Sequence, residues 1–246
     1  MAQLYTLDLG LTPYAAALAI QRRAAALRIT GELSEDLLLL VQHPPVVTLG
    51  RGFKPAHLLS TPEQLADAHV ELHEAERGGD ITVHEPGQLV GYVIIDLKRH
   101  RQDLHWFLRQ VEQGVIDGVG ALGVTATRRT GLTGVWVEDR KLASIGVHAR
   151  DWVTWHGFAL NVENNLRTFA HTVPCGIPGV EMTSVKRETH GAGEGAEGGV
   201  GESAEAGARL IGAAAIAVAE GMARAFGLSV TPLPGEQVAK VLLASI

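Results

Sequence analysis

The sequence predicts an α+β fold in a single domain, residues 1–246, with several sheet-forming runs and three or four helices. Short apolar runs such as 37–41, stopped by proline or glycine, are typical of buried strands. Longer segments such as 104–122 carry apolar residues every three or four positions, which indicates amphipathic helices. Hydrophobic residues make up 46% of the chain and charged residues 20%, as in a globular protein with a full core.

The first hundred residues alternate predicted strands with two helices. Thr12-Pro13 marks a helix start because proline is tolerated in the first turn, and the Ala/Leu/Arg-rich run to Arg28 continues that helix. Thr61-Pro62 begins a second, short helix by the same signal. Arg77 to Leu97 reads as a glycine turn, a strand, a Pro-Gly turn and another strand. The remaining strands are expected at 3–9 (ended by Gly10), 37–41, 46–52 and 70–75.

The rest of the chain continues with β-type runs between two long helices. We expect helices at 104–122, ended by Gly123, and at 207–226, ended by Gly227, with a short one in 235–246. The β-type runs are 134–137, 142–148 and 157–162. Residues 188–206 are rich in Gly, Ala and Glu and almost lack large apolar residues, so a flexible insert is expected there.

Charge and composition argue against several functional classes. The net charge of −6 argues against wholesale nucleic-acid binding, and no apolar run is judged long enough to span a bilayer. The eleven histidines are scattered and there is one cysteine, so neither a metal site nor another cofactor is expected. A single cysteine and a first segment without signal-peptide character lead us to expect a cytoplasmic protein.

Cys175 is the first candidate catalytic residue. It lies in the run Val173-Pro174-Cys175-Gly176-Ile177-Pro178-Gly179, a turn punctuated by proline and glycine rather than an apolar face. A buried structural cysteine prefers a packed strand or helix, and on composition alone that ordinary role is favoured. A reactive cysteine needs a partly exposed, electropositive setting, so the turn makes Cys175 a candidate nucleophile.

Lys141 is the candidate partner of the thiol. It follows three charged residues at a turn and then enters an apolar strand; otherwise it would be an ordinary solvated lysine. A free thiol has a pKa of about 8.5, and a nearby ammonium lowers it, which favours attack on a thioester. Backbone N–H groups near Gly176 and Ile177 are the expected oxyanion donors. A Cys–His pairing with His156 remains the alternative.

Four blocks of the sequence, taken in order, resemble the lipoyl(octanoyl) transferases of lipoate biosynthesis. The likeness covers roughly residues 1–187, and it is the ordered set that is specific. The blocks are Arg77-Gly78-Gly79-x-x-Thr82-x-His84-x-Pro86-Gly87-Gln88-Leu89-Val90; Gly134-Val135-Trp136-Val137 with Lys141-Leu142-Ala143-Ser144-Ile145-Gly146-Val147; His156-Gly157-Phe158-Ala159-Leu160-Asn161; and Pro174-Cys175-Gly176-Ile177 with Thr183-Ser184.

The resemblance implies a fold, a reaction and a set of site residues. The fold is a mixed sheet core flanked by helices, as in the catalytic domain of biotin and lipoate protein ligases. The reaction moves an octanoyl group from acyl carrier protein to a lysine of lipoyl domains, those of 2-oxoacid dehydrogenase complexes and the glycine cleavage H protein. An acyl thioester forms on Cys175, and Lys141 lowers the pKa of its thiol. The implied acyl pocket comprises Arg77, Gly78, Gly79, Asp80, Ile81, Thr82, Val83, His84, Ser144, Ile145, Gly146, Gly157, Phe158 and Ala159.

The sequence departs from the family pattern at two places, and rival functions remain. Glu85 stands where the family usually has glycine, and Tyr92-Val93 stands where it often has Tyr-Pro. We expect Glu85 to narrow or polarise the mouth of the site. The rivals are an ATP-using lipoate or biotin ligase of the same fold and a non-catalytic acyl-binding or carrier-docking protein.

Overall fold

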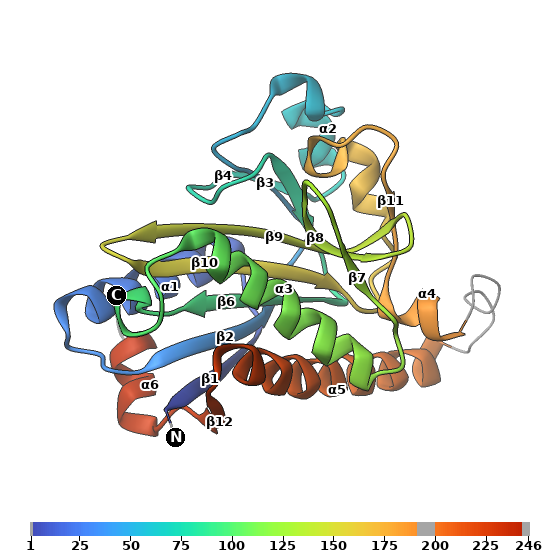
Figure 1. Cartoon of the computed structure of the whole chain (residues 1–246). Helices are drawn as coiled ribbons and strands as arrows, with labels where there is room; N and C mark the ends of the chain where they lie inside the picture. Colours follow the sequence, from blue (N-terminus) through green and yellow to red (C-terminus); the bar gives the residue numbers. More distant parts are fainter. Residues whose placement is uncertain (1, 191–199, 243–246) are drawn as a thin grey trace.

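The computed structural model describes residues 2–190 and 200–242, and a mixed β-sheet forms the centre of that part of the chain (Figure 1). The strands lie in the order β12-β1-β2-β6-β10-β9-β8-β7, and β11 pairs with β9 beside this path. β1 runs parallel to β2 and β12, whereas β2, β6, β10, β9 and β8 pair antiparallel. Their bounds are β1 Gln3–Leu11, β2 Asp36–Gln42, β6 Gln88–Ile94, β7 Thr127–Arg129, β8 Leu132–Val137, β9 Arg140–Arg150, β10 Val153–Asn161, β11 Glu181–Met182 and β12 Ser229–Pro232.

Helices cover both faces of this sheet because its central strands are apolar on both sides. In β2, Leu38 and Leu40 pack with the long helices α3 (Leu104–Ala121) and α5 (Val200–Phe226). Leu37 and Leu39 face the other way, toward α1 (Tyr14–Thr30) and α6 (Gly235–Leu242). This period of two follows from the pleat, and it explains why the leucine run of β2 is continuous rather than alternating.

A second, three-stranded sheet lies above the first in Figure 1 and carries part of the site. Its order is β4-β3-β5, with β3 Val46–Leu49, β4 Glu71–Glu74 and β5 Ile81–His84. The short helix α2 (Pro62–Asp67) packs on it through Leu65, and Thr61 closes a capping box at its start. Its β5 runs on into β6 of the main sheet through the turn at residues 85–87, so the two sheets are joined close to the site.

The predicted α+β class and mixed sheet are confirmed, with differences in detail. β1 continues to Leu11 because Gly10, at φ +61°, forms an irregularity instead of ending the strand. The strands β7, β11 and β12 and the short helix α4 (Val185–His190) were not predicted. The ends of the predicted insert, residues 188–190 and 200–206, are helical in α4 and α5, and residues 191–199 lie outside the described residues.

Helix α5 corrects the expectation that no apolar run is long enough to span a bilayer. Its part Glu205–Phe226 meets the requirements of length and composition among the described helices, and 44% of its apolar window is buried. Ala214, Val218 and Met222 are fully buried in the core shared with α3. This packing is that of a core helix.

Candidate active site

Lys141 and Cys175 lie far apart in the sequence and meet because β11 adds to the edge of β9. Glu181 and Met182 pair in parallel with Arg140 and Lys141, and the N–H of Thr183 donates to the carbonyl of Lys141 at 3.0 Å. The segment that follows Cys175 is thereby tied to the strand that carries Lys141. Two short backbone pairings therefore determine which lysine faces the thiol.

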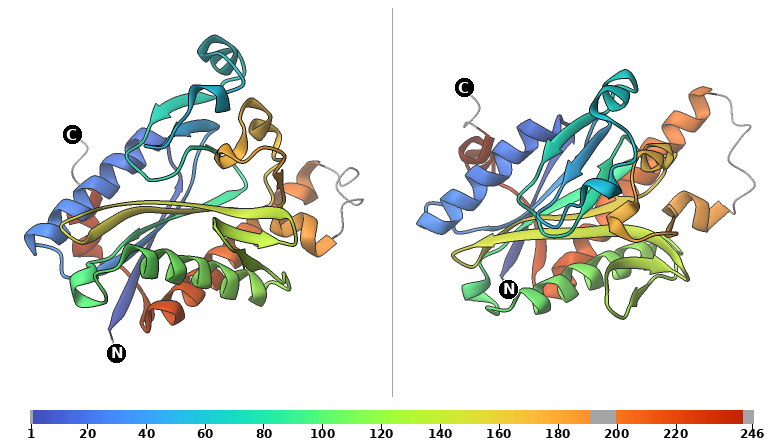
Figure 2. Two further views of the ribbon diagram at one scale, coloured as in Figure 1. Left: turned by 45° about the horizontal axis from the view of Figure 1, so that its top comes forward. Right: turned by 90° about the horizontal axis from the view of Figure 1, so that it is seen from above.

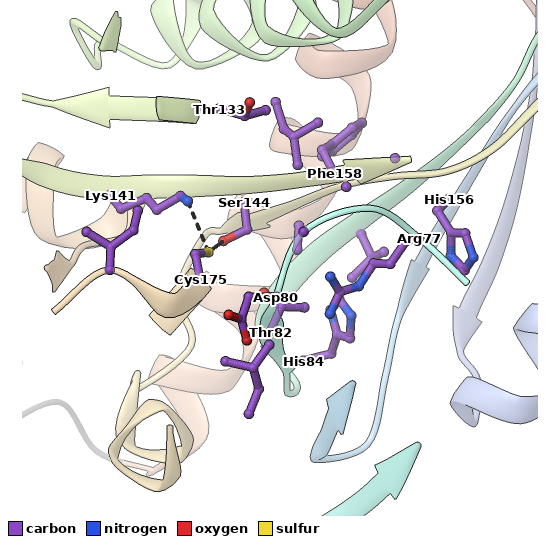
Figure 3. A pocket seen from close by; sticks show the side chains of 18 of the residues that line it. Arg77, Asp80, Thr82, His84, Thr133, Lys141, Ser144, His156, Phe158 and Cys175 are labelled. Atoms are coloured by element: carbon purple, nitrogen blue, oxygen red, sulfur yellow. Dashed lines mark hydrogen bonds between the residues drawn. The ribbon is translucent and has the colours of Figure 1, made fainter. Parts of the chain in front are cut away.

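Cys175 lies in a 3-10 turn, Pro174–Gly176, with a left-handed backbone at φ +56° and ψ +19°. The N–H of Val173, just before this turn, donates to the carbonyl of His57 at 2.8 Å. Left-handed backbone is uncommon for residues other than glycine and is retained where the surroundings enforce it, often at functional sites. The turn leaves Cys175 partly buried, with its side chain directed at Lys141 (Figure 3).

The thiol is in contact with one ammonium and one hydroxyl. Nζ of Lys141 lies 3.0 Å from Sγ of Cys175, and Oγ of Ser144 lies 3.3 Å from the same sulfur (Figure 3). Burial raises the pKa of the Cys175 thiol, but the Lys141 charge, the hydrogen bonds of Lys141 and Ser144, and the charge of Arg77 outweigh it. The pKa of Cys175 is therefore lower than that of an ordinary cysteine. The arrangement favours a thiolate.

The position of Lys141 is restricted by its neighbours. Its side chain is 2% exposed, and Nζ lies 5.2 Å from the centre of the Trp136 ring, close enough for a cation–π interaction. Gly134 has φ +134°, and a Cβ there would lie 2.8 Å from Cε of Lys141. A residue larger than glycine at 134 would displace the ammonium.

A cavity of about 230 Å³ opens beside the sulfur and lies between the two sheets. Its walls come from the start of β5, from β9 and β10, and from the loop between β7 and β8. The predicted residues that line it are Arg77, Gly79, Asp80, Ile81, Thr82, His84, Lys141, Ser144, Ile145, Gly146, Gly157, Phe158, Ala159 and Cys175. The fold thus brings nearly all candidate residues to one small cavity.

The end of the cavity away from Cys175 is lined by buried histidine and tyrosine side chains. Burial together with Arg77 lowers the pKa of His156 to about 3. His43 packs against Tyr92 and His84 without lining the cavity, and burial lowers its pKa to about 4. Burial also holds the pKa of His84 well below its usual value. These rings are neutral near pH 7. His43 is hydrogen-bonded to the hydroxyl of Tyr92 at 2.6 Å.

His156 is not placed as the partner of Cys175. Figure 3 shows it at the opposite end of the drawn pocket from the sulfur, with Arg77 and His84 between them. Within the described chain, Lys141 and Ser144 are the residues that hydrogen-bond to the Cys175 sulfur. Geometry therefore favours the Cys–Lys pairing over the Cys–His alternative.

One known protein family matches most of this chain. The lipoyl protein ligase A/B catalytic domain matches residues 13–195. The chain belongs to this family. Within it, the octanoyltransferase of Gloeobacter violaceus is 48% identical over 177 residues, which cover 72% of this chain and 78% of that protein. The octanoyltransferase of Geobacter sulfurreducens is 49% identical over 181 residues, 74% of each chain.

Solved structures share the fold of this family member at low identity. Lipoate-protein ligase A bound with ATP superposes with a TM-score of 0.70 at 12% identity, covering 98% of this chain and 92% of that chain. P. falciparum LipL1 in complex with lipoate gives a TM-score of 0.65 at 10% identity, covering 98% and 68%. At such identities the likeness supports the fold alone. The octanoyltransferase assignment comes from the sequence relatives.

Two residues predicted for the acyl pocket are placed elsewhere. Val83 lies on β5 between Thr82 and His84, so its side chain points to the opposite face, into the core of the small sheet. Gly78 is outside the cavity wall, and its N–H donates to the carbonyl of Val147 at 2.8 Å. Gly78 therefore joins the glycine turn to β9.

The expected role of Glu85 is also wrong. Its side chain is 4% exposed, and it is absent from the residues that line the cavity. One carboxylate oxygen accepts from the side chain of Asn164 at 2.9 Å and the N–H of Leu166 at 3.0 Å, and the other from Thr168 at 2.5 Å. Glu85 holds the loop that leads toward Cys175.

The expected oxyanion donors are engaged within the turn. The N–H of Gly176 donates to the carbonyl of Val173 at 2.9 Å, and that of Ile177 donates to the carbonyl of Pro174 at 3.1 Å. These bonds close the 3-10 turn that holds Cys175. Neither N–H is free to receive an oxyanion in this conformation.

Sequence reasoning missed several residues of the cavity wall. They come from the helix start, the middle of β6 and the tip between β7 and β8. The missed residues are Tyr14, Val90, Tyr92, Gly131, Leu132 and Thr133; Ile177, expected only as an oxyanion donor, also lines the cavity. Of these residues, only Gly131 carries a local sequence signal, which is that of a turn. That signal does not show that the turn lies beside the cavity.

Proposed function

We propose that this member of the octanoyltransferase family transfers its acyl group through a thioester on Cys175, with Lys141 as the residue that stabilises the thiolate. The observation that carries the proposal is the 3.0 Å separation of Nζ and Sγ at the wall of the cavity. Thiolates are the reactive form of cysteine, and a buried ammonium favours them.

The proposed donor is octanoyl-acyl carrier protein. The proposed acceptors are lysines in the lipoyl domains of 2-oxoacid dehydrogenase complexes and in the glycine cleavage H protein. A thioester donor is already activated, so the reaction needs no nucleotide. We propose the cytoplasm as its location, since a single unpaired cysteine suits a reducing compartment.

In the first half-reaction, Sγ of Cys175 attacks the carbonyl carbon of the donor. The new C–S bond forms, the bond to the donor sulfur breaks, and the donor leaves as a thiolate that takes a proton from water. Ile145, Gly146 and Phe158 offer apolar and small surfaces along which the alkyl chain can lie. In the second half-reaction, the acceptor amine attacks the thioester, and Cys175 leaves again as a thiolate beside Lys141.

Intact mass spectrometry tests the proposal. The enzyme is mixed with octanoyl-acyl carrier protein, without ATP and without acceptor, and we expect a gain equal to one octanoyl group. Peptide mapping should place the adduct at Cys175, and Cys175→Ser should show no thioester sensitive to hydroxylamine. An unmodified mass in an enzyme that nevertheless acylates a lipoyl domain would contradict a covalent intermediate.

A further inference from the structure

A histidine–aspartate pair lies next to the candidate nucleophile and has no part in the steps above. Nδ1 of His57 is 2.7 Å from Oδ2 of Asp80. Both side chains press against the residue after Cys175: a Cβ on Gly176 would lie 2.6 Å from Oδ2 of Asp80 and 2.9 Å from Cε1 of His57. Figure 3 shows the Asp80 carboxylate close to Cys175.

The pair is held in place by the backbone that leads to Cys175. The carbonyl of His57 accepts from the N–H of Val173, and the N–H of Leu59 donates to the carbonyl of His171 at 2.9 Å. Asp80 is fixed from the other side, since its carbonyl accepts from the N–H of Gly50 at 2.8 Å. The segments carrying His57, Asp80 and Cys175 therefore form one connected structure.

Each member of the pair keeps a free polar atom. Oδ1 of Asp80 is buried without a hydrogen-bond partner, and Nε2 of His57 has none within residues 2–190 and 200–242. The His57 side chain is 17% exposed, so protons can pass between its ring and water. A histidine whose Nδ1 bonds a carboxylate and whose Nε2 has no partner has the arrangement of a general base.

The second half-reaction creates a need for such a base. Acylation turns the Cys175 thiolate into a neutral thioester, which leaves the charges of Lys141 and Arg77 at the cavity without that anion. An acceptor lysine is an ammonium near pH 7 and is repelled by both. Among the described residues that line the cavity, Asp80 supplies the only carboxylate. The neighbouring histidines His84 and His156 are a poor alternative because burial lowers the pKa of both.

We propose that the His57–Asp80 pair is the base that takes the proton from the acceptor amine, a role that rests on the proposed Cys175 thioester. The acceptor loses one proton to water and attacks as the neutral amine. As its nitrogen bonds to the carbonyl carbon, Nε2 of His57 accepts the second proton, and Asp80 balances the imidazolium that forms. The C–S bond then breaks, its electron pair stays on Sγ as the thiolate, and His57 returns the proton to water.

The two half-reactions are measured separately to test this role. Purified octanoyl-enzyme, made as wild type and as His57→Gln, is mixed with a lipoyl domain, and single-turnover transfer is followed by mass spectrometry across pH. His57→Gln should form the octanoyl-enzyme at the normal rate but transfer it about 100-fold more slowly. The pH dependence of transfer should differ between this variant and the wild type. Asp80→Asn, which keeps an oxygen for His57 but removes the charge, should also slow transfer.

Hydroxylamine separates chemistry from distortion of the site. It is neutral near pH 7 and strongly nucleophilic, so it should cleave wild-type and His57→Gln octanoyl-enzymes at similar rates. The matched control is His171→Gln, whose ring bonds Ser60 at 2.8 Å in the same paired segments, whereas the ring of His57 bonds Asp80. It should leave both half-reactions unchanged.

Three outcomes overturn the inference. Wild-type transfer rates in both His57→Gln and Asp80→Asn would remove the pair from the reaction. If His57→Gln slowed both transfer and hydroxylamine cleavage to the same extent, the role of His57 would be structural. The absence of an adduct in the wild-type enzyme would overturn the proposed thioester itself, and this inference with it.

Discussion

Replacing Lys141 with methionine tests the thiolate argument directly. Methionine keeps an unbranched apolar side chain in the buried space of Lys141 and removes the ammonium that lies 3.0 Å from the Cys175 sulfur. At that distance two unit charges attract by about 5.5 kcal/mol at an effective dielectric constant of 20. Part of this is offset because burial raises the pKa of the thiol.

A loss of octanoylation rate on the order of 100-fold at pH 7 is the expected result, equivalent to about 2.7 kcal/mol at 1.36 kcal/mol for each tenfold change. In the wild type, a lowered thiol pKa means that reactivity is retained above that pKa and lost as pH falls through it. Without Lys141, burial still raises the pKa, so the reactive range should move to higher pH.

The assay is the rate of alkylation of Cys175 by iodoacetamide as a function of pH, together with single-turnover octanoylation. Cys175 is the only cysteine, so the alkylation signal has one source. Lys98→Met is the matched control, because Lys98 is largely exposed and pairs with Asp96. If Lys141→Met and wild-type protein showed the same midpoint of alkylation, the reasoning that links the ammonium to the thiolate would be refuted.

Three further outcomes follow from the same structure. Gly134→Ala should lower octanoylation sharply, because its Cβ would meet Cε of Lys141 at 2.8 Å and the backbone has φ +134°; normal single-turnover rates would contradict this. Glu85→Ala should lower the free energy of unfolding by about 2–4 kcal/mol, measured in urea, because it leaves the buried donors of the 164–168 loop without their acceptor. Stability should also fall with acid: the pKa of His43 is about 6.5 when unfolded and about 4 when folded, so its contribution is full above pH 6.5 and is lost toward pH 4. Urea titrations at several pH values would measure this, and His43→Gln should have a shallower slope.

Regular packing made much of the fold predictable. The run 104–122 was identified as a helix because Phe107, Val111, Val115 and Val119 recur on one face, and all four are fully buried in the core. The strand Ser229–Pro232 could not be found this way, since it is short and ends in proline. It forms because the edge of β1 offers a parallel partner, which is a tertiary effect.

The site residues that lie in the four sequence blocks could be predicted. Those whose position depends on strand pairing far along the chain were harder to predict. Lys141 and Cys175 were paired through the family resemblance, while the reason that they meet, the pairing of β11 with β9, left no local signal in Glu181–Met182. Alternation along β5 does not by itself exclude Val83, because Ile81 has the same parity and still lines the cavity. Glu85 could not have been placed, because its hydrogen-bond donors lie about eighty residues away.

The charges around the cavity also bear on the direction of the second half-reaction. In the proposed mechanism, a tetrahedral intermediate on Cys175 can expel either the acceptor amine or the sulfur. Lys141 is 2% exposed, so a positive charge there is costly without an anion, and expulsion of sulfur restores that anion at 3.0 Å. Expulsion of the amine would leave the ammonium of Lys141 beside a neutral thioester. The same ion pair that favours the nucleophile in the first step therefore favours its release in the second, and amide formation becomes the preferred outcome once the amine has lost its proton.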